Sequence, residues 1–188
     1  MQSFDTPAHP PTDVSPWIAR FGGLVPARSG VLDVACGHGR HARHFAALGH
    51  PVVAADIDTS GVSDLVDARD IRVDRVDLES GPWPYDTDAF GAIVVTNYLH
   101  RPHFDHYVAS LADGGILMID TFGAGNEALG RPRNPDHLLA PGELLDAFAH
   151  RLDIIAYEYG SETTPRPAVR QRLCAVKGHG PRPLTNDC

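Results

Sequence analysis

The chain has 188 residues, of which 43% are hydrophobic and 21% are charged, and its formal net charge at pH 7 is -8. This length and composition predict one globular domain with a sizeable core, and they exclude a collagen-like, disordered or disulfide-dense protein. The negative charge makes nucleic acid an unlikely partner, because binding to phosphates needs a basic surface.

The amino-terminal sequence predicts neither export nor membrane insertion. No apolar run approaches the roughly 20 residues that span a bilayer, and no basic segment followed by an apolar one begins the chain. We therefore expect a cytoplasmic protein without membrane contact. The three cysteines, Cys36, Cys174 and Cys188, are odd in number and widely spaced, which favours reduced thiols. The oligomeric state is left open.

The ends of the chain differ from its middle. Residues 1–14 are rich in proline and lack apolar periodicity, so they are expected to form a loose arm before a domain over 15–177. Residues 178–188 are rich in proline and glycine and are expected to form a flexible tail. Ser15 and Pro16 are typical of a helix N-cap and first helical position, and they begin a short helix through Phe21.

From Val31 onward, compact apolar runs alternate with helical patterns, which is typical of an α/β protein with buried parallel strands. Helical stripes fall around 42–46 and 104–111, and a later helix is expected to begin at Pro141. Asp113-Gly114-Gly115 predicts a turn before the fifth strand, whereas 121–140 is too broken by glycine and proline for regular structure. The expected strands are 31–36, 52–55, 71–76, 92–95, 116–119, 152–157 and 169–176.

The segment after the first strand carries a ligand-binding pattern, in which Val31-Leu32-Asp33-Val34-Ala35-Cys36 leads into Gly37-His38-Gly39 and then a helix. Glycines at such a turn let a ligand contact the backbone, and the helix N-terminus offers free N–H groups. A side chain at Gly39 is expected to project where the ligand lies. The turn also satisfies the looser dinucleotide pattern G-x-G-x-x-A, but Asp33 and an acid ending the next strand favour another cofactor.

The segment 31–39 resembles motif I of the class I S-adenosylmethionine-dependent methyltransferases. The resemblance continues at Asp56, whose family counterpart binds both ribose hydroxyls, and at Asp77-Leu78, whose counterparts contact adenine. It implies a Rossmann-like seven-stranded sheet in the order 3-2-1-4-5-7-6, with the last strand antiparallel and helices on both faces. S-adenosylmethionine is then the cofactor, and the implied cofactor-binding residues are Asp33, Ala35, Gly37, Gly39, Asp56, Ile57, Asp77, Leu78 and Asn97. Ala35 departs from the family pattern, in which many members carry glycine.

A looser resemblance links the chain to the short tellurite-resistance-type methyltransferases. It rests on Cys36-Gly37-His38-Gly39-Arg40, on Pro141-Gly142-Glu143-Leu144-Leu145 and on Ala156-Tyr157-Glu158-Tyr159-Gly160. The implied reaction is methyl transfer to a small-molecule or oxyanion acceptor by in-line displacement, which leaves S-adenosylhomocysteine. The loop 125–135 has no counterpart that can be carried over from the oxyanion enzymes, so the acceptor is not assigned.

The acceptor site is expected above the carboxyl ends of the strands, where open α/β sheets bind ligands. Lys177 is the only lysine, so an anionic acceptor would meet arginines. His100 follows the fourth strand and is the candidate catalytic residue. The glycine-rich stretch 121–140 is the candidate lid. The candidate substrate-binding residues are Tyr98, Arg101, Asn126, Arg131, Arg133 and Asn134.

Two histidine triplets, His38/His41/His44 and His100/His103/His106, have the spacing i, i+3, i+6. On a helix the third member falls about 120° short of two full turns from the first, so one helix presents all three poorly to a metal. We therefore predict no metal. Two alternatives to a methyltransferase stay open at this point, namely an NAD-dependent oxidoreductase that uses the same turn and a non-catalytic S-adenosylmethionine-binding protein.

Overall fold

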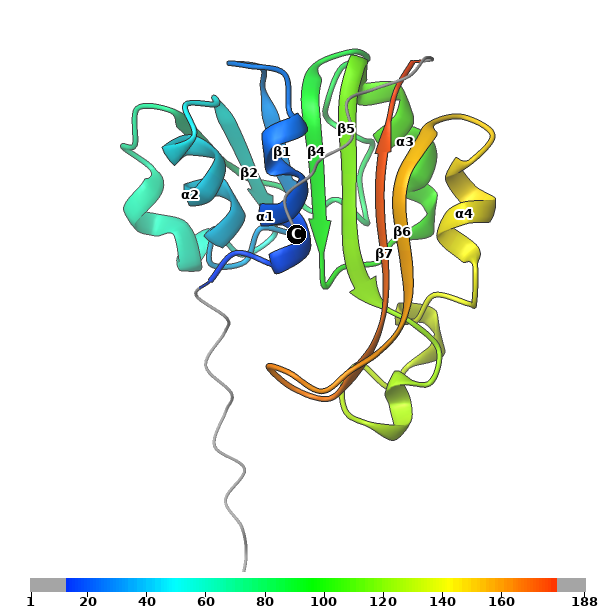
Figure 1. The fold of residues 1–188 in the computed structure, drawn as a ribbon. Helices are drawn as coiled ribbons and strands as arrows, with labels where there is room; N and C mark the ends of the chain where they lie inside the picture. Colours follow the sequence, from blue (N-terminus) through cyan, green and yellow to red (C-terminus); the bar gives the residue numbers. More distant parts are fainter. Residues whose placement is uncertain (1–12, 179–188) are drawn as a thin grey trace, which may run out of the picture.

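One mixed sheet organises residues 13–178, the part of the chain that the computed structural model describes. Its seven strands have the order β3-β2-β1-β4-β5-β7-β6, and β7 runs in the opposite direction to the other six (Figure 1). The predicted order and the predicted antiparallel strand are confirmed. The strands are β1 (Val31–Val34), β2 (Val52–Asp56), β3 (Ile71–Arg75), β4 (Phe90–Thr96), β5 (Leu111–Phe122), β6 (Asp153–Glu162) and β7 (Ala168–Val176).

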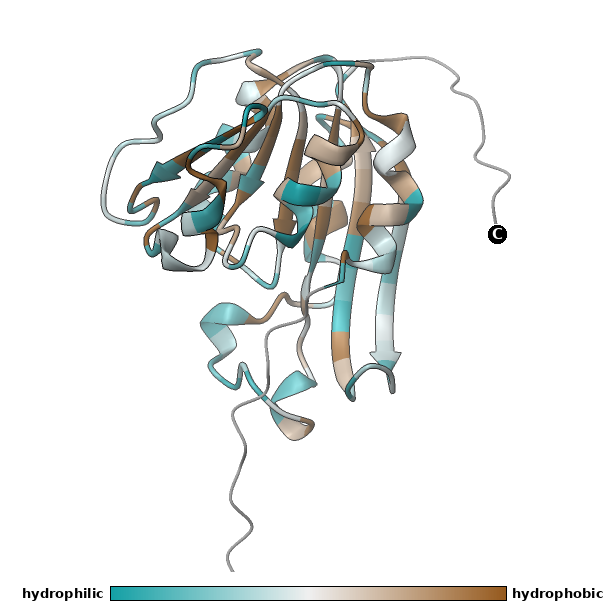
Figure 2. Cartoon of the chain, turned by 90° about the vertical axis from the view of Figure 1, so that its left-hand side faces the viewer, coloured by the Kyte–Doolittle hydropathy of each residue, from teal (hydrophilic) through white to brown (hydrophobic). Residues whose placement is uncertain are grey.

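Helices cover both faces of the sheet, as predicted (Figure 1). On one face, α1 (Pro16–Phe21), α2 (Arg40–Ala47) and the 3-10 helix η2 (Thr59–Leu65) contribute to one buried apolar cluster. On the other face, α3 (Phe104–Ser110) and α4 (Glu143–Phe148) contribute to a second cluster. The central strands are hydrophobic along most of their length (Figure 2), because apolar side chains are buried on both faces of a parallel sheet.

The first helix forms where the sequence predicts it. The Ser15 hydroxyl accepts a hydrogen bond from the backbone N–H of Trp17 at 3.2 Å, and Pro16 occupies the first turn, where its missing N–H costs nothing. Trp17, Ile18 and Phe21 are buried, and the Trp17 indole donates to the carbonyl of Leu173 on β7 at 3.1 Å. The helix is thereby fixed across the sheet near the carboxyl end of β1.

Gly114 and Gly115 lie within the fifth strand, at an irregularity in its pairing with β4, rather than in the predicted turn before it. Strand β5 begins at Leu111, and its pairing with β4 shifts between Phe90 and Ala92. Gly114, with φ of +77°, donates to the carbonyl of Lys177 at 2.7 Å, and the Lys177 N–H donates to Gly115 at 2.9 Å. These hydrogen bonds keep the segment in the sheet, so the strand is longer than the apolar run suggests.

The stretch after β5 is largely irregular, as predicted, and includes two short 3-10 helices, η4 (Asn126–Ala128) and η5 (Pro135–His137). The Ala124 N–H donates to the carbonyl of Leu139 at 2.9 Å, which closes the stretch into a loop. This loop and the β6–β7 hairpin extend beyond the carboxyl edge of the parallel strands (Figure 1). Together they flank the edge where a ligand site is expected.

Some expectations fall at or beyond the limits of the description. Residues 1–12 of the predicted arm and 179–188 of the predicted tail lie outside the described residues, as does Cys188. Cys36 and Cys174 are buried free thiols, in agreement with the sequence. Within 13–178, every helix is too short or too polar to cross a bilayer.

Candidate functional site

The turn between β1 and α2 exposes backbone to solvent at the carboxyl edge of the sheet. Ala35 and Gly37 have φ of +51° and +55°, and a methyl group placed on Gly37 would meet no atom within 4 Å. The Gly39 N–H donates to the carbonyl of Cys36 at 2.8 Å, which tightens the turn. The left-handed backbone at these positions therefore opens one side of the turn to a ligand.

Asp56 ends β2 and links that strand to the turn. Its Oδ2 accepts a hydrogen bond from the Gly37 N–H at 2.8 Å, and its Oδ1 accepts one from the Asp58 N–H at 3.0 Å. A carboxylate has lone pairs to spare after two such bonds. Asp56 can therefore accept further hydrogen bonds from the hydroxyl groups of a ligand while it holds the turn.

A first cavity of about 300 Å³ lies beside this carboxylate. On its other side Asp77 follows β3, and its Oδ1 accepts hydrogen bonds from the backbone N–H groups of Glu79 at 3.0 Å and Ser80 at 3.2 Å. Hydrogen bonds from the Ser80 side chain and from the backbone of Glu79 and Ser80 lower the pKa of Asp77 and fix the segment that follows. The cavity is lined by Ala35, Asp56, Ile57, Val76, Asp77, Leu78, Glu79, Ser80 and Tyr98, so five of the predicted cofactor residues meet there.

Asp33 and Gly39 lie behind the turn and do not line this cavity. Asp33 is buried, and its Oδ2 accepts a hydrogen bond from the Ala42 N–H at the start of α2 at 3.0 Å. A Cβ on Gly39 would lie 2.6 Å from Cγ1 of Val62 in η2. The expectation that a side chain at Gly39 projects toward the ligand is therefore wrong, because that direction is filled by the protein core.

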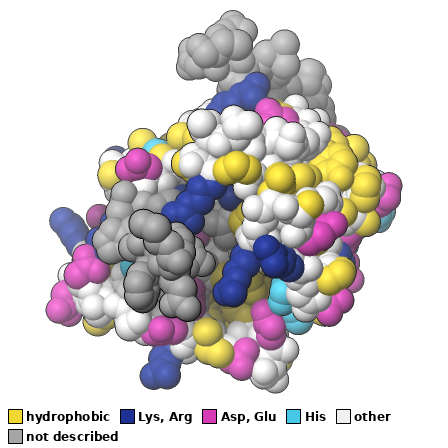
Figure 3. All heavy atoms as spheres, turned by 90° about the horizontal axis from the view of Figure 1, so that it is seen from below, with side chains coloured by type: hydrophobic (Ala, Val, Ile, Leu, Met, Phe, Trp, Pro, Cys, Tyr) yellow, Lys and Arg dark blue, Asp and Glu magenta, His cyan; other side chains and the backbone are white. Residues whose placement is uncertain are grey.

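A second cavity of about 290 Å³ adjoins the first, with which it shares Glu79 and Tyr98. Its wall combines residues from the end of β4, the end of β5 and the loop beyond it. The molecule seen from this side shows hydrophobic side chains beside a hollow that Lys and Arg side chains border (Figure 3). The cavity is lined by Glu79, Asn97, Tyr98, Leu99, Thr121, Phe122, Pro132 and His137.

Asn97 and Tyr98 are the predicted residues that reach this second cavity. Asn97 has φ of +55°, and its side-chain oxygen accepts a hydrogen bond from Nη1 of Arg170 at 2.9 Å. The sequence analysis did not single out Glu79, Phe122 or His137. Glu79 could have been found, because it follows Asp77 closely at the carboxyl end of the third strand.

Three predicted substrate residues make hydrogen bonds that shape the loop. Arg101 pairs with Glu143 at 2.6 Å and donates to the carbonyls of Asp136 and Leu138. Asn126 is buried, donates to the carbonyl of Pro132 and accepts a hydrogen bond from the Val169 N–H, and the Asn134 oxygen accepts one from the Asp136 N–H. None of the three lines either cavity.

Arg131 and Arg133 are exposed on the same loop, and they too lie outside the walls of both cavities. The Arg133 guanidinium donates to the carbonyl of Gly130 at 3.4 Å. Their proposed contact with an acceptor, and the closure of 121–140 as a lid, stay predictions.

His100, the candidate catalytic residue, is not part of either cavity wall. Its ring lies 4.4 Å from that of His103, whose Nδ1 lies 3.4 Å from Nδ1 of His106. The three rings thus come together at the start of α3, next to the Trp83 indole. Among residues 13–178, no group of three His, Cys, Asp or Glu side chains has the arrangement of a metal site.

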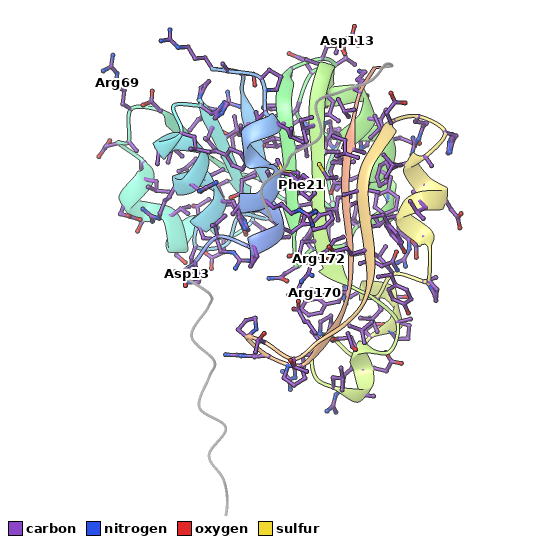
Figure 4. All side chains as sticks on the ribbon, in the orientation of Figure 1. Asp13, Phe21, Arg69, Asp113, Arg170 and Arg172 are labelled. Carbon is purple, nitrogen blue, oxygen red and sulfur yellow. The ribbon has the colours of Figure 1, made fainter. Side chains whose placement is uncertain are left out.

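A buried ionic network joins β5, β7 and the chain before α1. Asp120 accepts a hydrogen bond from the Ser15 hydroxyl at 2.7 Å and pairs with Arg170 and Arg172, each at 3.1 Å. Arg170 also pairs with Glu162 at 2.9 Å. Figure 4 shows both arginines near the carboxyl edge of the sheet. The sequence analysis missed this network, because its members come from strands that are distant along the chain.

His41 and Asp33 lie side by side beneath the turn with unusual pKa values. Burial lowers the pKa of His41 to about 3 and raises the pKa of Asp33 to about 7. The Ser15 N–H donates to Nε2 of His41 at 3.3 Å, which requires a neutral imidazole. At pH 5 the folded protein therefore holds a proton on Asp33 and none on His41, whereas the unfolded chain does the reverse.

Because folding shifts the pKa values of Asp33 and His41 in opposite directions, their effects on the pH dependence of stability should cancel in the wild-type protein. The His41 contribution is fully present above about pH 6.5 and is lost as the pH falls toward 3, whereas the Asp33 contribution is present below about pH 4 and is lost as the pH rises toward 7. The two slopes cancel between about pH 4 and 6.5. Asp33→Asn leaves only the His41 term, so its stability relative to wild type should fall by about 1.4 kcal/mol per pH unit on acidification.

Urea unfolding of both proteins at pH 4.5, 5.5 and 6.5 measures this difference. His41→Gln is the matched control, because it leaves only the Asp33 term, and its relative stability should change in the opposite direction. Parallel pH profiles for wild type and Asp33→Asn would contradict the assigned protonation states.

Comparisons with known proteins place this geometry in context. Residues 31–115 match the model of a family described as a methyltransferase domain. No curated protein matches the sequence. The matched residues run from β1 into β5 and therefore include the turn, Asp56 and Asp77.

Solved structures share the fold at low sequence identity. TehB from Haemophilus influenzae has a TM-score of 0.68 and 17% identity over 84% of this chain and 62% of that chain, so the present chain spans less than two thirds of TehB. An S-adenosylmethionine-dependent methyltransferase from Methanosarcina mazei has a TM-score of 0.66 and 15% identity, over 88% of this chain and 98% of that one.

A third similar structure is the 1,6-didemethyltoxoflavin-N1-methyltransferase of Burkholderia thailandensis, which was solved with 1,6-didemethyltoxoflavin and S-adenosylhomocysteine bound. Its TM-score is 0.62 and its identity 16%, over 87% of this chain and 75% of that chain. These likenesses show that the chain has the fold of S-adenosylmethionine-dependent methyltransferases. The match of residues 31–115 to a methyltransferase domain agrees with this fold.

Proposed function

We propose that the chain transfers the methyl group of S-adenosylmethionine to a small-molecule acceptor by in-line displacement. The observation that carries this proposal is the pair of adjoining cavities at the carboxyl edge of the sheet. The first is bordered by Asp56 and Ala35 of the cofactor-type turn, and the second shares Glu79 and Tyr98 with it. A donor and an acceptor could therefore bind side by side.

The residues of the first cavity fit the chemistry of the cofactor. Asp56 offers carboxylate lone pairs to the ribose hydroxyls, and the open backbone at Gly37 allows close approach of a ligand. Leu78 provides an apolar surface for adenine, and the Asp77 carboxylate lies next to it. Asp33 and Gly39 do not line the cavity; they position the start of α2 and the turn that borders it.

When bound, S-adenosylmethionine supplies an electrophilic methyl group on a sulfonium. The chain contributes alignment, since holding reacting atoms about 3 to 3.5 Å apart accounts for much of the rate of such reactions. Tyr98 lines both cavities, so its ring can shield a bound donor from bulk water. Burial and the nearby Glu79 carboxylate raise the pKa of Tyr98, so its phenol stays protonated and can donate a hydrogen bond at neutral pH.

The proposal predicts cofactor binding and transfer of label in one set of experiments. Calorimetry should show saturable binding of S-adenosylhomocysteine and none of NAD. Incubation with methyl-labelled S-adenosylmethionine and a fractionated cell extract should yield a labelled small molecule, with tellurite and selenite tested alongside. Asp113→Asn, which changes an exposed carboxylate at the opposite edge of the sheet (Figure 4), is the control variant that should behave as wild type.

Two outcomes would contradict this function. Tight NAD binding would favour an oxidoreductase that uses the same turn. Binding of S-adenosylhomocysteine without labelled product in any fraction, with tellurite or with selenite, would instead favour a binding protein without catalytic activity.

A further inference from the structure

The second cavity has an acidic and aromatic wall. Glu79 supplies the one carboxylate among the described residues that line it, and neither lysine nor arginine lines it. Tyr98 and Phe122 supply aromatic surface. A wall of this kind attracts positive charge through its carboxylate and through the faces of its rings.

Two arginines that contact residues around this cavity are already paired with carboxylates, whereas Arg131 and Arg133, on either side of Pro132, are exposed and lie outside the cavity wall. Arg170 packs over the Phe122 ring at 4.5 Å, but its guanidinium pairs with Asp120 and Glu162. Arg101, behind the loop, pairs with Glu143 at 2.6 Å. A guanidinium that is saturated by carboxylates offers little to an incoming oxyanion, because the anion would have to displace an existing partner.

Of the polar groups close to Glu79, the Tyr107 hydroxyl is buried without a hydrogen-bond partner within the described protein. The Tyr98 hydroxyl interacts with the Glu79 carboxylate, and His103 interacts with the backbone of Leu78. Tyr107 and His103 are 1% and 3% exposed. Burial raises the pKa of both phenols, and the Glu79 carboxylate raises it further, which places its charge near them. His103 and Tyr107 do not line the cavity, so they bear on a ligand there only through Glu79 and Tyr98, which do line it.

Every member of this polar set can accept a hydrogen bond. The Glu79 carboxylate can only accept, and phenol oxygens can accept as well as donate. Burial and the neighbouring His100 and His106 lower the pKa of His103 to about 4, so its imidazole is neutral at pH 7. Such a set is matched by a ligand that carries N–H donors or a positive charge.

We propose that the second cavity takes an acceptor with an amino or other N–H-bearing group on an apolar or aromatic body, and that Glu79 is its specificity-determining residue. This inference rests on the proposed function, because it identifies the acceptor of the same reaction. It departs from the expectation of an anionic or oxyanion acceptor. An oxyanion would be repelled by the Glu79 carboxylate, and no lysine or arginine among the described lining residues offsets that repulsion.

The test uses calorimetry on the complex with saturating S-adenosylhomocysteine at low ionic strength. The probes are phenethylamine and 3-phenylpropionate, which have a similar aromatic body and opposite charge, and inorganic tellurite as the oxyanion. Phenethylamine should bind at least tenfold more tightly than 3-phenylpropionate, and tellurite should not compete with it.

Glu79→Gln removes the charge and nearly preserves the shape of the side chain. It should weaken phenethylamine binding about tenfold and abolish the preference for the amine. Saturation with S-adenosylhomocysteine keeps any effect of Glu79 on the first cavity separate from this measurement. Asp113→Asn makes the same change of charge at the opposite edge of the sheet and should retain the preference.

Equal affinity for the two organic probes, tighter binding of either anion, or lack of saturable phenethylamine binding would overturn the acceptor class. A preference that persists in Glu79→Gln would overturn the role of Glu79. If S-adenosylhomocysteine itself does not bind to wild type, the proposed function fails and this inference fails with it. The separate cofactor titration therefore distinguishes the two failures.

Discussion

Asp56→Ala is expected to weaken S-adenosylhomocysteine binding by roughly ten- to hundredfold, as measured by calorimetry. The substitution removes charge-assisted hydrogen bonds to the ribose hydroxyls, which contribute about 1.5 to 3 kcal/mol. It also removes the acceptor for the N–H groups of Gly37 and Asp58. Part of the loss should therefore come from a turn that is no longer held in its binding conformation.

Asp56→Asn separates the two contributions. The amide oxygen can still accept one of the backbone hydrogen bonds, whereas the negative charge that faces the ribose is lost. We expect an affinity between those of wild type and Asp56→Ala, with a near-wild-type melting temperature. Asp113→Asn again serves as the control for loss of one carboxylate. Wild-type affinity in Asp56→Asn would show that the carboxylate supports the turn alone and does not bind the cofactor.

The cofactor side of the site could be predicted from the sequence because its signals are local. Asp56 ends β2 and Asp77 follows the end of β3 closely, and in a parallel sheet the ends of neighbouring strands meet at one edge. A residue in such a position needs only its own strand to be identified. The position of Asp56 beside Gly37 then follows from the pairing of β1 with β2.

The acceptor side could not be predicted in the same way. Phe122 and His137 come together because the loop after β5 folds back on the sheet. Arg101 holds this loop through the carbonyls of Asp136 and Leu138, which no sequence pattern indicates. The polar residues of that loop were expected to face the acceptor. Asn126 instead bonds to the backbone of Pro132 and Val169, because a buried irregular segment must satisfy its own polar groups.

Sequence patterns also do not report which way a side chain would point from a turn. Gly37 and Gly39 look equivalent in a Gly-x-Gly motif, and both have left-handed backbone conformations. Only the packing of η2 distinguishes them, since Val62 and Leu65 fill the space next to Gly39 and leave the space next to Gly37 open. The two glycines should therefore respond differently to the same substitution.

Gly39→Ala is expected to lower the free energy of unfolding by roughly 2 to 4 kcal/mol, because it combines overpacking with an unfavourable left-handed conformation. Its Cβ would lie 2.6 Å from Val62 Cγ1 and 3.1 Å from Leu65 Cδ1, and both side chains are buried in the core. Gly37→Ala is the matched variant. It should cost only about 1 kcal/mol, from the backbone conformation alone, while its methyl group weakens S-adenosylhomocysteine binding.

Urea unfolding and calorimetry on both variants measure these two effects, and a double-mutant cycle tests their cause. In the background of Gly39→Ala, Val62→Ala removes the atom that the new Cβ would meet. The two changes together should therefore destabilise the protein by at least about 1 kcal/mol less than the sum of the single changes. Additive effects would mean that the chain accommodates the methyl group without contact with Val62. A stable Gly39→Ala that has lost cofactor binding would instead return Gly39 to the ligand side of the turn.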